Sequence, residues 1–375
     1  MQLFYLFSNP FVTSRVHRLE LRLGDIKKVL GPGANTSGSR IQRQLKHTIA
    51  RVFGGFKLPP IAVSVTGVIK DIIKITNKLV NVRELRIVLW DFTPSSESYH
   101  LQPLFSSFWS SFGPKLCILS LKGNLGNFRN LIKNPKLDGL QELSVDFSLP
   151  SGRAIIVDVL LPFINSLAPH LLSLRLWCWP SLDLPTFFAQ LAPFPNLKNL
   201  IIHTPFKKAF GNTSGFEDLI RHSSGTVQRV HLCLNPTGLT VDSEEPLSQW
   251  LLDYISNITR FSDLLQILDM YPTDMYAGMK LLSDCIERTS QSLAELSLRD
   301  RHLQDGGIEA IINVASCSNL IYLRVTIRKL DVALTDHLAL NLPKIDRLWL
   351  STREYSVVDP KYLVVCAPHR NWYKH

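Results

Sequence analysis

Eleven times along this chain, an aliphatic residue is followed by a second one three positions later and by a third after two more. The triplets are Val16/Leu19/Leu21, Val82/Leu85/Ile87, Leu116/Leu119/Leu121, Leu140/Leu143/Val145, Leu171/Leu174/Leu176, Leu197/Leu200/Ile202, Val227/Val230/Leu232, Leu265/Leu268/Met270, Leu293/Leu296/Leu298, Leu320/Leu323/Val325 and Ile345/Leu348/Leu350. From Val82 onward their starts are 24 to 38 residues apart. The last two aliphatics alternate with one other residue, as on a strand with one buried and one solvated face. The spacing therefore predicts one short strand in each of eleven irregular repeats.

The segments between the triplets have apolar residues at helical spacing. They cover residues 68–79, 101–112, 154–167, 186–191, 216–222, 247–258, 276–288, 308–316 and 332–340. Pro185 and Pro246 lie where a first helical turn tolerates proline, and Asp305 precedes two glycines at another expected start. A strand with one helix cannot bury its own apolar face, so successive units must stack. We predict an α/β solenoid (horseshoe) in a single domain over residues 1–375, with parallel strands on its concave face and helices on its convex face.

Composition limits the class of protein. The chain is 45% hydrophobic and 19% charged, which is typical of a globular protein. Its six cysteines include no CxxC pair, which indicates reduced thiols in an intracellular protein. No apolar run approaches the roughly 18 residues of a membrane span. We expect a cytoplasmic or nuclear protein that does not contact a membrane.

The net charge of +10 is concentrated in one segment. The triplets at Val16 and Val82 are 66 residues apart, so residues 22–60 form a basic insertion or a degenerate repeat. Between residues 22 and 57, eight Lys and Arg residues stand against one Asp; the basic segment includes Lys27, Lys28, Arg40, Arg43, Lys46 and Arg51. A solvated loop with a basic helix over residues 41–53 is one interpretation. The alternative is anion or nucleic-acid binding through phosphate contacts.

The strand residues that alternate with the aliphatics are the candidate binding residues. On the second half of the chain they include Arg, Trp and Tyr, the residue types that dominate interface energetics. The predicted partner-binding residues of the concave face are Arg175, Trp177, His203, Arg229, His231, Asp269, Tyr271, Glu295, Arg299, Tyr322, Arg324, Arg347 and Trp349. In the first half, Glu84, Glu142 and Asp146 give the same face a more acidic character.

Signatures of catalysis are missing from the sequence. It contains no GxSxG, HExxH, kinase or dinucleotide-binding motif. His203 and His231 occupy similar places in two of the predicted strands, but neither has a Cys or carboxylate at metal-ligand spacing. We therefore predict no enzyme, no catalytic residue, no metal and no cofactor. A site assembled from residues far apart in the sequence stays an alternative.

The repeats RVHRLEL, NVRELRIVL, GLQELSVDF and NLIYLRVT resemble the irregular leucine-rich repeats of ribonuclease-inhibitor-like domains. The opening SNPFVTSRVHRLELRL resembles fungal F-box-type proteins, in which an F-box precedes such repeats. This resemblance implies a substrate receptor of a cullin ubiquitin ligase, whose F-box binds the adaptor and whose repeats bind the substrate. Only 15 residues precede the first triplet, and none resembles an F-box helix. We expect a non-enzymatic protein-interaction scaffold, an F-box-like receptor without a recognisable F-box. The sequence does not identify its protein partner, and nucleic acid is the less favoured partner.

Overall fold

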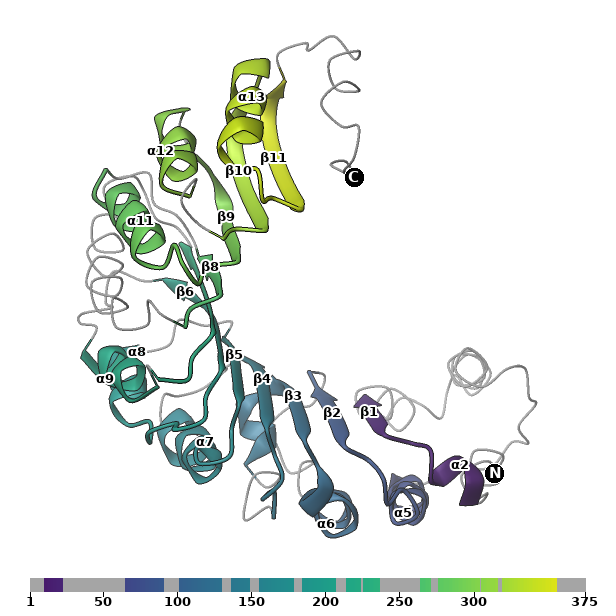
Figure 1. The fold of residues 1–375 in the computed structure, drawn as a ribbon. Coiled ribbons are helices and arrows are strands. Elements are labelled where there is room, and N and C mark those ends of the chain that lie inside the picture. Colours follow the sequence, from purple (N-terminus) through teal and green to yellow (C-terminus); the bar gives the residue numbers. More distant parts are fainter. Residues whose placement is uncertain are drawn as a thin grey trace, which may run out of the picture. The chain divides into compact units, whose positions relative to one another are not determined.

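A computed structural model describes most of the repeat region (Figure 1). The described residues are 10–22, 65–90, 101–129, 136–148, 155–178, 184–206, 214–223, 225–236, 264–270, 276–303, 305–315 and 319–355. The chain divides into two compact units, Met1–Leu171 and Leu172–His375. The prediction of one domain over the whole chain stays a prediction.

The strands of both units are parallel and follow one another in sequence order. The first unit contains β1 (Arg18–Arg22), β2 (Glu84–Leu89), β3 (Ile118–Asn124) and β4 (Glu142–Ser148). The second contains β5 (Ser173–Cys178), β6 (Asn199–Phe206), β7 (Arg229–Pro236), β8 (Ile267–Met270), β9 (Glu295–Leu303), β10 (Tyr322–Leu330) and β11 (Arg347–Tyr355). Each strand carries the second and third aliphatics of one triplet, so the predicted strands are confirmed.

The triplets are in register within each unit. In the first unit Leu85 pairs with Leu19 and Leu119, and the row continues to Leu143. In the second, the second aliphatics form one row across β5 to β11, namely Leu174, Leu200, Val230, Leu268, Leu296, Leu323 and Leu348. The inner members of these rows are at most 2% exposed, whereas those on the outermost strands β1 and β11 are half-buried. The apolar spacing thus sets strand register directly.

Within each unit, a repeated backbone contact joins one repeat to the next. The carbonyl of the residue after the first aliphatic accepts hydrogen bonds from two successive N–H groups of the following repeat, at 2.8–3.2 Å. These carbonyls belong to His17, Arg83, Cys117, Leu172, Lys198, Gln228, Gln266, Ala294 and Ile321. Because each pair of N–H groups lies at the start of a strand, the contact fixes where pairing begins.

The predicted helices are also present wherever the structure describes their segments. The first unit contains α2 (Pro10–Thr13), α5 (Val65–Thr76), α6 (Gln102–Ser111), the short helices η3 (Gly113–Lys115) and η4 (Leu125–Phe128), the π-helical turn η5 (Ile156–Leu160) and α7 (Leu161–Leu167). The second contains α8 (Leu184–Ala189), α9 (Ser214–Ser223), α11 (Tyr276–Arg288), α12 (Asp305–Ala315) and α13 (Val332–Asn341). The segment 247–258 lies outside the described residues.

Within each unit the helices of the described ranges lie on one side of the strands (Figure 1). The helices bury large side chains against the triplets. On α6, Phe105 and Phe108 are at most 1% exposed, and their ring centroids are 6.1 Å apart. The α/β class with parallel strands on one face and helices on the other is therefore confirmed. None of the helices in the described ranges is long and apolar enough to cross a bilayer.

Candidate functional site: the open face of the second unit

The candidate site is the side of β5 to β11 that faces away from the described helices (Figure 1), which we term the open face. It consists of the strand side chains that alternate with the buried aliphatics, and β5 and β10 illustrate the alternation of buried with exposed or half-buried positions. The structure places ten of the thirteen predicted residues fully on this face, and these are Arg175, Trp177, His203, Arg229, His231, Glu295, Tyr322, Arg324, Arg347 and Trp349. Asp269 also lies there, although it is only 5% exposed. Tyr271 and the side chain of Arg299 lie outside the described part of the chain.

One group of contacts on this face joins β5 to β6. The guanidinium carbon of Arg175 lies 5.4 Å from the centroid of the Trp177 ring. Trp177 pairs in register with His203 on β6, and their ring centroids are 4.0 Å apart. A cation over an indole face is favoured by the ring quadrupole. The indole therefore contacts both its own strand's Arg and the imidazole of the next strand.

His231 and Asp269 face each other on β7 and β8. They are partners in the strand register, and Nδ1 of the imidazole lies 3.2 Å from Oδ2 of the carboxylate. The imidazole of His231 thus gives the nearly buried carboxylate of Asp269 a polar partner. Among the described residues, no three His, Cys, Asp or Glu side chains are arranged to hold a metal ion. The expectation that His203 and His231 do not form a metal site stays a prediction, since the side chain of Cys233 lies outside the described part of the chain.

A second group of contacts covers β9 to β11. Nη2 of Arg347 lies 2.8 Å from Oε1 of Glu295, two strands away, and its guanidinium carbon lies 4.9 Å from the ring centroid of Tyr322 on the strand between them. The guanidinium of Arg324 lies 5.2 Å from the centroid of the Trp349 ring. Trp349 is 44% exposed, so this group presents aromatic and cationic surface to solvent.

Three arginines of the open face have no carboxylate within ion-pair distance among the described residues. They are Arg175, Arg229 and Arg324, whereas Arg347 is paired with Glu295. The Nε atom of Arg229 is buried and has no hydrogen-bond partner in the described part of the chain. Asp269 and Glu295 contact His231 and Arg347, so among the described residues these three arginines are left without a carboxylate partner on this face.

The corresponding side of the first unit is different because its charges neutralise one another. Arg18 pairs with Glu84 at 3.1 Å, and Lys122 pairs with Asp146 at 3.0 Å. Glu20 lies 2.7 Å from Arg22 and 3.6 Å from Arg86. The hydrogen bond from Arg22 is the main cause that lowers the pKa of the Glu20 carboxyl. The predicted acidic character of this side is therefore offset by basic partners on the same and neighbouring strands.

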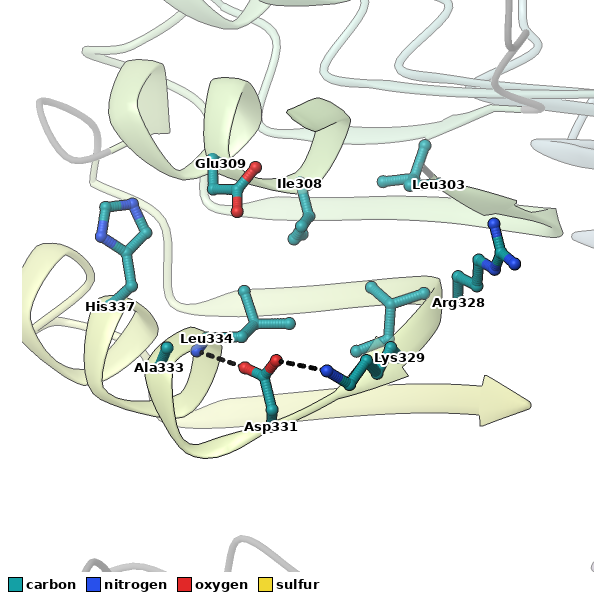
Figure 2. Close-up of a pocket in the computed structure, with 10 residues that line it drawn as sticks. Leu303, Ile308, Glu309, Arg328, Lys329, Asp331, Ala333, Leu334 and His337 are labelled. Carbon is teal, nitrogen blue, oxygen red and sulfur yellow. Dashed lines mark hydrogen bonds and ion pairs between the residues drawn. The ribbon is translucent and has the colours of Figure 1, made fainter. Parts of the chain in front are cut away.

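A pocket of about 370 Å³ lies elsewhere, beside α12 and α13 (Figure 2). Two of its polar groups have a structural role, because the Asp331 carboxylate accepts a hydrogen bond from the Leu334 N–H at 3.0 Å and lies 3.3 Å from Nζ of Lys329. This arrangement caps the start of α13. At the other side of the pocket, Nδ1 of His337 lies 3.1 Å from Nδ2 of Asn341 on the same helix. We therefore place the candidate site on the open face and not in this pocket.

The basic segment cannot be compared with the structure. Lys27, Lys28, Arg40, Arg43, Lys46 and Arg51, together with the helix predicted over residues 41–53, lie outside the described residues. Its proposed binding of anions stays a prediction.

Comparison with known proteins supports the fold. No protein-family model matches the chain, and no match is found among the curated proteins. Among solved structures, the chain is similar to a chain in the crystal structure of the Rad7 and Elc1 complex in yeast, with 15% identity, a TM-score of 0.50, and coverage of 95% of this chain and 90% of that one. At this identity the likeness concerns the fold alone. Together with the in-register triplets, it identifies the chain's architecture as a leucine-rich-repeat solenoid.

Proposed function

We propose that this protein is a non-enzymatic scaffold that binds another protein through the open face of its second unit. The observation that carries the proposal is the stacking of Arg324 on the exposed ring of Trp349, beside the matching stack of Arg347 on Tyr322. Arg, Trp and Tyr side chains contribute most to the energy of protein interfaces. Here they are already held in place by one another, which lowers the entropy lost on binding.

The rigidity of the surface supports the same function. The backbone of each repeat is fixed by the paired hydrogen bonds to the preceding carbonyl, and the triplet aliphatics beneath the open face are buried. A parallel sheet held in this way presents side chains at fixed lateral spacings of about 4.8 Å. Such a surface suits recognition of an extended partner across several strands.

We further propose that the bound protein is a substrate of a ubiquitin ligase. This finer proposal rests on the resemblance of the repeats to those of F-box-type receptors. The similar yeast chain comes from a complex of two proteins, Rad7 and Elc1, which is compatible with a fold of this kind working in an assembly. In the proposed receptor the open face holds the substrate, and a different part of the chain binds the ligase adaptor.

Affinity purification from cells tests the scaffold. The wild type is compared with Arg324→Glu/Trp349→Ala and with Arg288→Glu, a charge reversal at an exposed position near the end of α11. We expect specific proteins to be lost from the open-face variant and retained by the Arg288 variant, with co-purified proteins identified by mass spectrometry. A ligase adaptor retained by both variants would support the receptor role. If the open-face variant keeps every partner, or if only nucleic acid co-purifies, the proposed site is wrong and the basic segment becomes the better candidate.

A further inference from the structure

We propose that the open face recognises an acidic segment of its partner, bound as an extended chain across β5 to β10, with carboxylates on Arg175, Arg229 and Arg324. This inference rests on the proposed function, because it assigns the chemistry of the partner at the same site. It follows from how the charges of the face are distributed.

Two of the three arginines are held in place by aromatic rings. Arg175 lies over Trp177 and Arg324 lies over Trp349, at 5.4 and 5.2 Å from the ring centroids. A cation–π contact of this kind restricts the guanidinium without using its N–H groups as donors, so they stay available for two parallel hydrogen bonds to a carboxylate. Both side chains are therefore restricted in position before an acidic ligand binds.

Arg229 lies between these two stacks. Its partners in the strand register are Asn199 on β6 and Ile267 on β8, and neither carries a charge. Its Nε atom is buried without a hydrogen-bond partner among the described residues. Because that Nε is buried, a carboxylate would reach the half-buried Arg229 through its Nη groups, whose charge no carboxylate of the described residues neutralises.

The acidic residues of the face do not satisfy these three arginines. Asp269 contacts His231 at 3.2 Å, and Glu295 contacts Arg347 at 2.8 Å. In the first unit, by contrast, each described basic side chain at the equivalent strand positions lies 2.7–3.6 Å from a carboxylate; these side chains are Arg18, Arg22, Arg86 and Lys122. Among the described residues, arginines without a carboxylate partner are thus a feature of the second unit's open face.

The strand spacing sets the length of the ligand. Arg175 on β5 and Arg324 on β10 are five strand intervals apart, about 24 Å at roughly 4.8 Å for each interval. An extended chain covers that distance in about seven residues. Arg229 lies two intervals from Arg175 and three from Arg324, and it is two residues nearer the start of its strand than the row that joins them, so we expect acidic residues near positions 1, 4 to 5 and 8 to 9 of the bound segment.

The positions of the carboxylates on this face favour a peptide over a nucleic acid. Asp269 and Glu295 lie on the strands between Arg229 and Arg324. A phosphodiester chain crossing the face would carry a charge past each carboxylate, whereas a peptide can place neutral residues there.

A random twelve-residue peptide library displayed on phage tests the inference with purified full-length protein. We expect selected peptides to carry three acidic residues spread over about eight positions. We expect the affinity of a selected peptide to fall tenfold or more in Arg175→Gln/Arg229→Gln/Arg324→Gln, as charged hydrogen bonds are lost. Arg288→Gln should bind as the wild type does, and Arg324→Lys should bind more weakly because it keeps the charge but loses the planar fork.

The outcomes separate this inference from the proposed function. Selected peptides that are apolar or basic, or that bind the triple variant equally well, would overturn the acidic ligand. If partners from cells are nevertheless lost in Arg324→Glu/Trp349→Ala, the scaffold stands and only its assigned chemistry fails. A twelve-residue oligothymidine that binds more tightly than any selected peptide, and loses affinity in the triple variant, would instead assign the face to nucleic acid.

Discussion

Arg324 on β10 and Trp349 on β11 are partners in the strand register, and the guanidinium of the first lies over the indole of the second at 5.2 Å. Neighbouring parallel strands place such partners side by side on the same face of the sheet. The contact lies on the outermost strand of the second unit, where Trp349 stays 44% exposed. The ring thus serves to orient Arg324 while leaving its own outer surface open.

A double-mutant cycle of Arg324→Gln and Trp349→Leu should show a favourable coupling of about 0.5–1 kcal/mol in the free energy of unfolding, the usual value for an exposed cation–π pair. Urea denaturation of the four proteins measures it. The matched control is a cycle of Arg175→Gln and Trp349→Leu, whose effects should add because the two residues lie on β5 and β11. Equal coupling in both cycles would show that the cation–π contact contributes nothing to the free energy of unfolding.

The buried triplets predict where truncation is costly. Leu119 is fully buried on β3, and Leu119→Ala should lower the free energy of unfolding by about 2–5 kcal/mol, because it removes packing and leaves a cavity. Leu340 on α13 is 80% exposed, so Leu340→Ala should change stability by less than about 0.5 kcal/mol. The same urea experiment checks both variants. A loss at Leu340 as large as that at Leu119 would be incompatible with the described burial.

The sequence predicted the strands well because the triplet spacing carries both period and register. Leu85, Leu119 and Leu143 are aligned in the structure as they are in the repeats. Helix boundaries were less certain. The apolar spacing placed one helix over residues 308–316, whereas α12 begins at Asp305, the residue that the start signal indicated, and includes Gly306 and Gly307 in its first turn. Glycine has a low helix propensity, so the apolar pattern alone did not extend the helix over these two residues. Packing of α12 against neighbouring helices stabilises the added turn, and the sequence of a single helix does not show that packing.

The pairing of side chains on the open face was missed, although the signal was present. Once the triplets are aligned, the residues between their last two aliphatics form a row, and that row puts His231 beside Asp269 and Arg324 beside Trp349. The contact between Arg347 and Glu295 could not be derived in this way, because it reaches across β10 to a strand that is not a neighbour. Whether such a contact forms depends on the length and rotamer of the arginine side chain, and the repeat pattern does not give the rotamer.

Gly123, at the end of β3, should not tolerate a side chain. Its φ of 147° lies in a region that other residues rarely adopt, and an added Cβ would lie 2.8 Å from the carbonyl carbon of Leu89. Gly123→Ala should therefore cost about 1–3 kcal/mol or more in unfolding free energy. Gly225→Ala is the control, since an added Cβ there meets no atom within 4 Å. A comparison of thermal midpoints decides the matter, and equal midpoints for the two variants would contradict the strained backbone.

Burial should protect two of the described thiols from alkylation. Cys178 and Cys285 are each 2% exposed, and burial raises the pKa of both, to about 12 for Cys285. Cys117 is half-buried. Brief treatment with iodoacetamide at pH 8 should label Cys117 ahead of the other two, with peptides quantified by mass spectrometry. In urea the three should react alike, and selective labelling of Cys285 in the folded protein would contradict its burial.

The cap of α13 gives the stability of the second unit a dependence on pH. The hydrogen bond from the Leu334 N–H, followed by the nearby Lys329, lowers the pKa of Asp331 below its ordinary value of 3.8. Since the folded-state pKa is the lower one, the ionised carboxylate contributes stability that is present above pH 3.8 and is lost as the pH falls through the lowered value.

Asp331→Ala should cost about 0.5–2 kcal/mol at pH 7, the usual loss for a helix N-cap. Asp331→Asn keeps an acceptor for the Leu334 N–H but has no charge, so the wild type should exceed it in stability at pH 7 by a margin that shrinks as the pH falls below 3.8. Urea midpoints between pH 3 and 7 measure that margin. Asp346→Asn is the control, because Asp346 is exposed and its side chain makes no hydrogen bond within the described residues. A margin for Asp331→Asn that stays constant or widens toward low pH would mean that the carboxylate's charge does not stabilise the start of α13.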